Sequence, residues 1–291
     1  MKNRTISRRG FLGFAGGLVA AATLPTHTFA ATPSTAKLFF TEVGNGRNIM
    51  LLHGWTADSL DWRWQLPVLE KRYRTIAVDL RGHGKSEVMP SGGYMPANYV
   101  ADLEALIESK HEGEKFVLIG HSMGGQLAAR LATKRPDLVE AVVSVDGSLG
   151  FSADLAPVFE KANNDLMAGD PSVVAPALFN HFYDPATSPD LKSWHARRAQ
   201  EMSKHVIRES FGPLLVGADQ VGIGQQSELF CRQLSVPFYH LCRDPEQAQR
   251  MRSWFANPKS KVEMWENAGH WIMQDRPDDV NAALIAWIDS L

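Results

Sequence analysis

Cysteine is scarce in this 291-residue sequence, which has only Cys231 and Cys242. Two cysteines are too few for a disulfide framework. We expect both to be free, buried thiols, because one falls late in a predicted helix and the other at the far end of the next strand. The sequence also lacks any Cys/His cluster with metal-ligand spacing. It therefore predicts neither a disulfide-stabilised scaffold nor a metal centre.

An excess of basic charge is also missing, since 30 lysines and arginines stand against 32 acidic residues. Leaving out the four basic residues of segment 1–30 gives 26 basic against 32 acidic side chains, a net charge near −6. Such a chain has no general attraction for nucleic acid or anionic lipid. We expect a small-molecule substrate, no nucleic-acid partner, and no membrane association after the N-terminal segment is removed.

The N-terminal segment has no acidic residue and only a short apolar run, Phe11 to Leu24, which is too short to span a bilayer. Four basic residues precede this run: Lys2, Arg4, Arg8 and Arg9. Small residues follow it near Ala30, where a signal peptidase would cut. The stretch "SRRGFL" resembles the twin-arginine export signal. We expect residues 1–30 to be such a signal and the mature protein to be periplasmic or secreted.

From residue 36 onward, short β-branched runs alternate with helical patterns, which is typical of a mostly parallel sheet covered by helices. Strands are predicted at 36–43, 48–52, 74–79, 115–120, 140–146, 236–242 and 261–266. Helices are predicted to begin near Asp61, Pro96, Ser122, Ser227, Pro245 and Pro277. The fold class is therefore α/β, with a central sheet flanked by helices.

The alternation is interrupted once, over residues 147–226, where helical periodicity continues without a convincing strand. We interpret this stretch as a helical cap inserted into a core made of residues 31–146 and 227–291. The cap is rich in large apolar side chains: Phe151, Phe159, Phe179, Phe182, Trp194, Met202 and Phe211. We expect most of them to pack the cap onto the core and some to line an apolar pocket.

The stretch "GHSMG" at 120–124 sets one serine between glycines, with a predicted strand before it and a helix after it. This is the pattern of the Gly-x-Ser-x-Gly nucleophile elbow, in which a strained turn exposes the serine. Small flanking residues let the strand and helix approach closely, and the helix N-terminus offers N–H groups to a developing negative charge. The competing interpretation is an ordinary serine N-cap.

Two further segments favour the elbow. "LLHGWTADSLDW" follows the second strand, and "NAGHWIMQD" places His270 after the last strand. With these residues in place, the chain from about residue 36 to its end resembles an α/β-hydrolase. The resemblance implies that Ser122 is the nucleophile and His270 its base, and that the backbone N–H groups of Trp55 and Met123 form the oxyanion hole.

Two acids compete to complete the catalytic triad. Asp244 follows the penultimate strand, the commoner position in the family, but Pro245 and Gln247 after it make it look like a helix N-cap. Family strands that present an acid there usually carry a preceding glycine, where this chain has Cys242 and Arg243. Asp146 ends the strand after the nucleophile helix, a position that some α/β-hydrolases use. We favour Asp146 and keep Asp244 as the alternative.

The resemblance implies hydrolysis of a small-to-medium apolar carboxylic ester or lactone through an acyl-serine, as in carboxylesterases and lactonases, without metal or organic cofactor. Dehalogenases and epoxide hydrolases of this fold attack with an aspartate, whereas the elbow here holds serine. The alternatives are a perhydrolase or C–C hydrolase, a cofactor-free oxygenase of the same fold, and a non-catalytic binding protein. In "DLRGHGKS" and "DWRWQLPVLE", Arg81, Trp62, Trp64 and Leu69 are expected to have structural roles.

Overall fold

The computed structural model describes residues 35–291, so the predicted export signal lies outside the described residues. Seven strands form one sheet in the order β1-β3-β2-β4-β5-β6-β7. Only the pairing of β1 with β3 is antiparallel. The strands are β1 Phe39–Val43, β2 Asn48–Leu52, β3 Arg74–Asp79, β4 Phe116–His121, β5 Val139–Val145, β6 Phe238–Cys242 and β7 Lys261–Met264.

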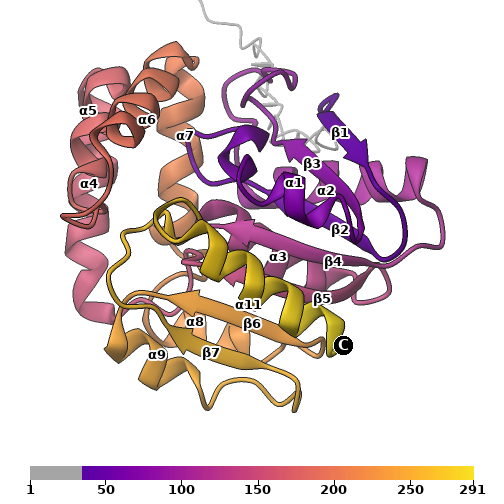
Figure 1. Cartoon of the computed structure of the whole chain (residues 1–291). Helices are drawn as coiled ribbons and strands as arrows, with labels where there is room; N and C mark the ends of the chain where they lie inside the picture. The colour runs from indigo at the N-terminus through magenta and orange to yellow at the C-terminus, as the bar shows by residue number, and fades with distance from the viewer. Residues whose placement is uncertain (1–34) are drawn as a thin grey trace, which may run out of the picture. The chain divides into compact units, whose positions relative to one another are not determined.

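Helices cover both faces of this sheet (Figure 1). α2 (Pro96–Lys110) and α3 (Met123–Lys134) pack side by side on one face, and the short α1 (Leu66–Leu69) contacts α11 (Pro277–Asp289) on the other. The interior strands β4 and β6 are buried along their whole length. Strands buried on both faces have no polar side to alternate with the apolar one, as expected of a parallel sheet. The α/β fold class is therefore confirmed.

The insertion between β5 and β6 begins with the 3-10 turn η2 (Ala153–Leu155). Four helices follow: α4 Ala156–Ala168, α5 Pro171–Phe179, α6 Pro189–Glu201 and α7 Lys204–Leu215. An isolated bridge joins Phe151 to Ile223 where the chain leaves and re-enters the core. Figure 1 shows α4 to α7 grouped beyond the carboxyl ends of the strands, so this helical group adjoins the edge where parallel sheets bind ligands.

The chain returns to the sheet through α8 (Gly224–Cys231), and α9 (Pro245–Met251) and α10 (Ile272–Asp275) complete the helices. The start of α8 lies three residues before Ser227, where a helix was predicted. Cys231 and Cys242 are free and buried, as predicted. Among residues 35–291, no helix is long and apolar enough to cross a membrane.

Two of the differences between predicted and observed elements have local reasons. The first strand begins at Phe39 and not at Ala36, because the N–H groups of Ala36 and Lys37 bond to side chains of other segments. The helix predicted from Asp61 is instead a 3-10 turn, η1 (Ser59–Trp62), followed by the separate helix α1. Proline lacks a backbone N–H and is best tolerated in the first turn of a helix, which is where Pro67 lies in α1.

Candidate active site

Ser122 lies at the sharp turn between β4 and α3, in a backbone conformation that serine rarely adopts. Its φ is 51° and its ψ is −115°, whereas most non-glycine residues avoid positive φ. Its side chain makes no capping bond to the helix, so the structure does not support the ordinary N-cap interpretation. The strain is held in place by the sheet, since Ser122 N–H donates to Val145 O of β5 over 3.1 Å.

The glycines around Ser122 allow this close approach. A Cβ atom on Gly124 would lie 2.3 Å from the Leu52 carbonyl oxygen of β2, and one on Gly120 would lie 2.2 Å from Gly124 O. Both contacts are with backbone, which has no side-chain rotamer to relieve them. The elbow therefore needs glycine at both positions, as the sequence pattern predicts.

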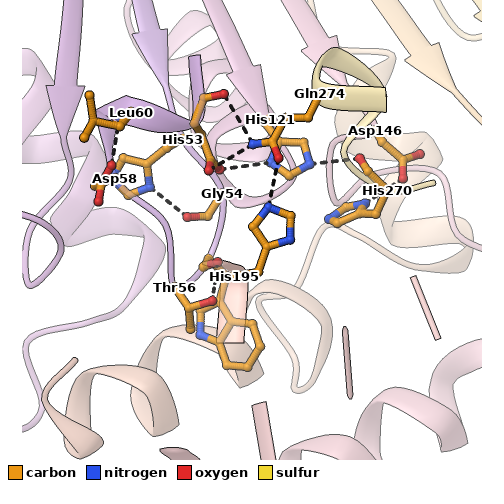
Figure 2. A network of polar contacts seen from close by, with 12 residues as sticks. His53, Gly54, Thr56, Asp58, Leu60, His121, Asp146, His195, His270 and Gln274 are labelled. Carbon is orange, nitrogen blue, oxygen red and sulfur yellow. Dashed lines mark hydrogen bonds and ion pairs between the residues drawn. The ribbon is translucent and has the colours of Figure 1, made fainter. Parts of the chain in front are cut away.

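The structure brings His270 to Asp146 (Figure 2). His270 Nδ1 lies 2.6 Å from Asp146 Oδ2. An ionised carboxylate only accepts hydrogen bonds, so Nδ1 carries the proton and Nε2 is the ring's proton acceptor. Asp244 instead caps α9, accepting the N–H of Glu246 at 2.9 Å and that of Gln247 at 3.4 Å. Of the two candidate acids, Asp146 is therefore the partner of His270.

Asp146 is buried, and burial by itself would raise the pKa of its carboxyl group. The hydrogen bond and charge of His270, together with the Arg243 guanidinium, outweigh burial and hold the pKa of Asp146 well below its ordinary value. Arg243 Nε donates to Asp146 Oδ2 over 2.9 Å, the same oxygen that faces His270. Asp146 is therefore ionised at neutral pH and able to orient His270.

The turn after β2 is held by His53. His53 Nε2 accepts the Leu80 N–H at 2.9 Å, so its Nδ1 carries the proton and donates to Gly54 O at 2.7 Å. In a trans peptide the N–H points opposite to the C=O. The bond to Gly54 O therefore directs the Trp55 N–H away from His53. Gly54 itself packs against Ser122, since a Cβ built on it would lie 3.2 Å from Ser122 Cβ.

The two N–H groups predicted to form the oxyanion hole have no acceptor in the described part of the chain. Met123 is the first residue of α3, where a helix leaves its N–H groups without intrahelical partners. No acceptor among residues 35–291 takes the Trp55 N–H. The Trp55 indole is fixed separately, because its Nε1 donates to Ile207 O of α7 over 3.2 Å. Both amides are therefore available to a bound anion.

His121, within the elbow, supports the loop that carries His270. Its Nε2 donates to the His270 carbonyl oxygen over 3.0 Å. Burial, together with the nearby charge of His270, lowers the pKa of His121 to about 3, so it stays neutral. From the helical insertion, Phe182 O accepts the His270 N–H at 2.7 Å. His270 is thus positioned from both the core and the insertion.

A buried polar network joins α6 to the core beside this site (Figure 2). His195 Nε2 donates to Gln274 Oε1 over 2.9 Å, and Gln274 Nε2 donates to Asp61 Oδ1 over 3.1 Å. Arg198 of α6 pairs with the fully buried Asp61 and, over 3.1 Å, with Asp58. Burial alone would raise the pKa of Asp61, but the charge and hydrogen bond of Arg198, together with His195 and His121, outweigh burial and lower it. Asp61 is therefore an ionised anchor for α6.

Replacing Arg198 with methionine is expected to lower the free energy of unfolding by about 3–5 kcal/mol, because Asp61 would remain as an unpaired buried charge. The adjacent Arg197 is exposed and gives a matched control, since Arg197→Met should change the same free energy by less than about 0.5 kcal/mol. Denaturant unfolding of both variants measures the difference. Equal stability of the two variants would contradict the anchoring role.

A cavity of about 230 Å³ lies where the strand ends meet the helical insertion. Ser122, His270, Trp55 and Arg243 line it, together with an apolar wall. Five of the large insertion side chains belong to that wall: Phe151, Phe159, Phe179, Phe182 and Phe211. The expectation that most of the seven only pack the insertion onto the core is therefore wrong, because the insertion turns these rings toward the strand ends.

The sequence did not reveal the roles of Arg243, His195, Arg198 and Gln274. Arg243 had one usable signal, a cation directly after the carboxyl end of a buried strand. Arg198 and Gln274 contact Asp61 directly, and His195 joins them through Gln274, so these contacts depend on how α6 and α10 pack against the turn that carries Asp61. Arg81 has the structural role expected of it, because it forms a buried ion pair with Asp102 over 2.5 Å.

A mostly parallel sheet, a strained serine elbow and a histidine–aspartate pair at the strand ends together define the class of α/β hydrolases. The profile of the alpha/beta hydrolase family matches residues 49–283, and the chain belongs to that family. A solved esterase structure from Thermogutta terrifontis matches with a TM-score of 0.75 at 24% identity, covering 90% of this chain and 96% of that one. At that identity the likeness shows the fold alone.

Two curated relatives are enzymes. The chain is 39% identical over 105 residues to a 2-(acetamidomethylene)succinate hydrolase of Mesorhizobium japonicum, covering 36% of this chain and 37% of the relative. It is 23% identical to bifunctional epoxide hydrolase 2 of Rattus norvegicus over 313 residues, covering 90% of this chain and 55% of the relative. The chain thus spans about a third to a half of the length of these relatives.

Proposed function

We propose that this protein is a serine hydrolase that cleaves a carboxylic ester or lactone. The observation that carries the proposal is the 2.6 Å contact of His270 Nδ1 with Asp146 Oδ2, in the cavity that Ser122 also lines. This contact leaves His270 Nε2 unprotonated, as a general base requires. A histidine in this tautomer, sharing a cavity with a strained serine, suits nucleophilic acyl transfer.

In the proposed reaction the Ser122 hydroxyl oxygen attacks the substrate carbonyl carbon while His270 takes the hydroxyl proton. The N–H groups of Trp55 and Met123 stabilise the oxyanion, and each such donor is typically worth about 3 kcal/mol. The bond to the leaving oxygen then breaks as His270 gives the proton to that oxygen, and Ser122 remains as an acyl-serine. A water molecule deprotonated by His270 then attacks the acyl carbon, and the bond to Ser122 Oγ breaks as His270 returns the proton to that oxygen, which releases the acid and restores the serine hydroxyl.

The serine at the elbow favours ester or lactone cleavage over the epoxide opening that the Rattus norvegicus relative's name indicates. Epoxide hydrolases of this fold attack with an aspartate, and position 122 holds serine. A serine hydroxyl activated by a neutral histidine can attack a carbonyl carbon. The two free backbone N–H groups can then donate hydrogen bonds to the developing oxyanion. The apolar wall of the cavity is suited to a substrate whose acyl or alcohol group is apolar and of small to medium size.

A substrate panel tests the proposal. We expect the full chain to hydrolyse p-nitrophenyl esters and simple lactones, with kcat/KM rising with acyl length until the cavity of about 230 Å³ is filled. Styrene oxide should not be opened. Opening of the epoxide without ester cleavage would contradict the proposed reaction, and equal activity on acetate and hexanoate esters would contradict the apolar pocket.

A further inference from the structure

Arg243 is the only lysine or arginine among the described residues that line the cavity. It follows Cys242, the last residue of β6, and enters a wall that is otherwise mostly apolar. About a third of its side chain is exposed, with a relative accessibility of 32%. A guanidinium group in such a wall is costly unless its N–H groups have partners.

The Arg243 guanidinium uses only part of its donor set. Its Nε donates to Asp146 Oδ2 over 2.9 Å, and that oxygen also faces His270 Nδ1. Within residues 35–291, Nη1 and Nη2 form no hydrogen bond or ion pair. Because Arg243 and His270 contact the same carboxylate oxygen, the unpaired edge of the guanidinium lies close to the proposed catalytic base.

Asp146 does not by itself explain an arginine at this position. Its charge already has the hydrogen bond from His270, and Arg243 adds only a single N–H, which a smaller donor could also supply. The arginine guanidinium is planar, and its terminal N–H groups can donate two parallel hydrogen bonds to one carboxylate. In Arg243 these terminal groups, Nη1 and Nη2, are the ones without a partner among residues 35–291. The chain has a formal net charge of −2, so attraction of an anion depends on a local cation such as this one.

We propose that Arg243 binds a carboxylate of the substrate, so that the substrate is an otherwise apolar ester or lactone with an anionic carboxylate near the bond that is cleaved. This inference rests on the proposed hydrolase function and narrows its substrate class. The carboxylate accepts the free N–H groups of Arg243, while Nε stays on Asp146. Arg243 thereby aligns the reacting carbonyl beside Ser122.

Two pairs of matched esters test this inference. One pair is the p-nitrophenyl monoester of adipic acid and the corresponding ester of its terminal amide, with the carboxylate on the acyl side. The other pair is 5-acetoxypentanoate and 5-acetoxypentanamide, with the carboxylate on the alcohol side. We expect kcat/KM of the wild-type chain to favour the carboxylate over the amide in at least one pair by about 10- to 100-fold, as for a charged hydrogen bond.

Arg243→Gln should abolish this preference and bring the carboxylate-to-amide ratio close to one. Activity on the amide ester should also fall, because Asp146 loses a donor, so the ratio is the measure of carboxylate binding. Arg243→Lys, which keeps the charge, should retain part of the preference. Arg252→Met removes an exposed arginine that does not line the cavity, and should leave the ratio unchanged.

The outcomes separate this inference from the proposed function. Hydrolysis of both members of each pair at similar rates by the wild-type chain would overturn the role of Arg243 and leave the hydrolase proposal standing. An equal loss for carboxylate and amide in Arg243→Gln would show that Arg243 acts only by positioning Asp146, which also overturns carboxylate binding. Failure to hydrolyse any of the four esters would overturn this inference, and the hydrolase function would fall with it only if the p-nitrophenyl esters and lactones of the first panel also stayed intact.

Discussion

The Asp146→Asn variant is expected to lose about 10⁴-fold in kcat on any ester that the wild-type chain cleaves. The amide of asparagine keeps the size of the side chain, but it removes the charge that stabilises protonated His270. It also lets the Nδ1 position accept a hydrogen bond, which favours the wrong histidine tautomer. Steady-state kinetics on a p-nitrophenyl ester measures the loss.

Asp244→Asn is the matched control for this prediction. Asp244 accepts the first N–H groups of α9, and asparagine caps a helix nearly as well as aspartate. We therefore expect its kcat to stay within a few-fold of wild type. Near-normal turnover by Asp146→Asn, or a loss of several decades in Asp244→Asn, would contradict the assignment of the acid.

The second large effect is expected from Ser122→Ala, which should lower kcat by about 10⁶-fold if the serine forms the acyl intermediate. Ser148 gives the control within the same cavity, because it is also a lining serine and lies outside the elbow. Ser148→Ala should lose less than about tenfold. Turnover of Ser122→Ala within tenfold of wild type would instead indicate a reaction that does not use this nucleophile.

The sheet and the positions of Ser122 and His270 were predictable because their signals are local. Alternating strand and helix patterns placed both residues just beyond strand ends, and parallel strands gather their carboxyl ends at one edge. The choice of Asp146 over Asp244 also rested on neighbouring residues, since Pro245 and Gln247 mark Asp244 as a helix cap. The structure shows the capping bonds directly.

The polar contacts around the insertion were not predictable in the same way. Arg198 and Asp61 lie 137 positions apart, and their pairing depends on how α6 folds back over the strand ends. Neither residue has a local pattern that marks it as buried. Single charged residues are usually exposed, so a sequence pattern assigns them to the surface unless a partner is known.

Some element ends and the short helix after β2 were predicted wrongly, because individual hydrogen bonds and single residues such as Pro67 decide where an element begins and ends. The apolar spacing of Trp62 and Leu69 is compatible with one helix, yet Pro67 disfavours a helix that runs through it and favours one that begins at Leu66. The segment therefore divides into η1 and α1. Both Trp62 and Leu69 are still fully buried, so the apolar pattern indicated burial correctly although it misjudged the helix.

The most direct test of the central claim is the mass of the covalent adduct after the full chain reacts with a fluorophosphonate. We predict one adduct per chain, located on Ser122 by peptide mapping. The adduct should be absent from Ser122→Ala and should form much more slowly in His270→Gln, in which the base is lost. Ester hydrolysis by a wild-type chain that carries no adduct, or carries it on a residue other than Ser122, would contradict the account.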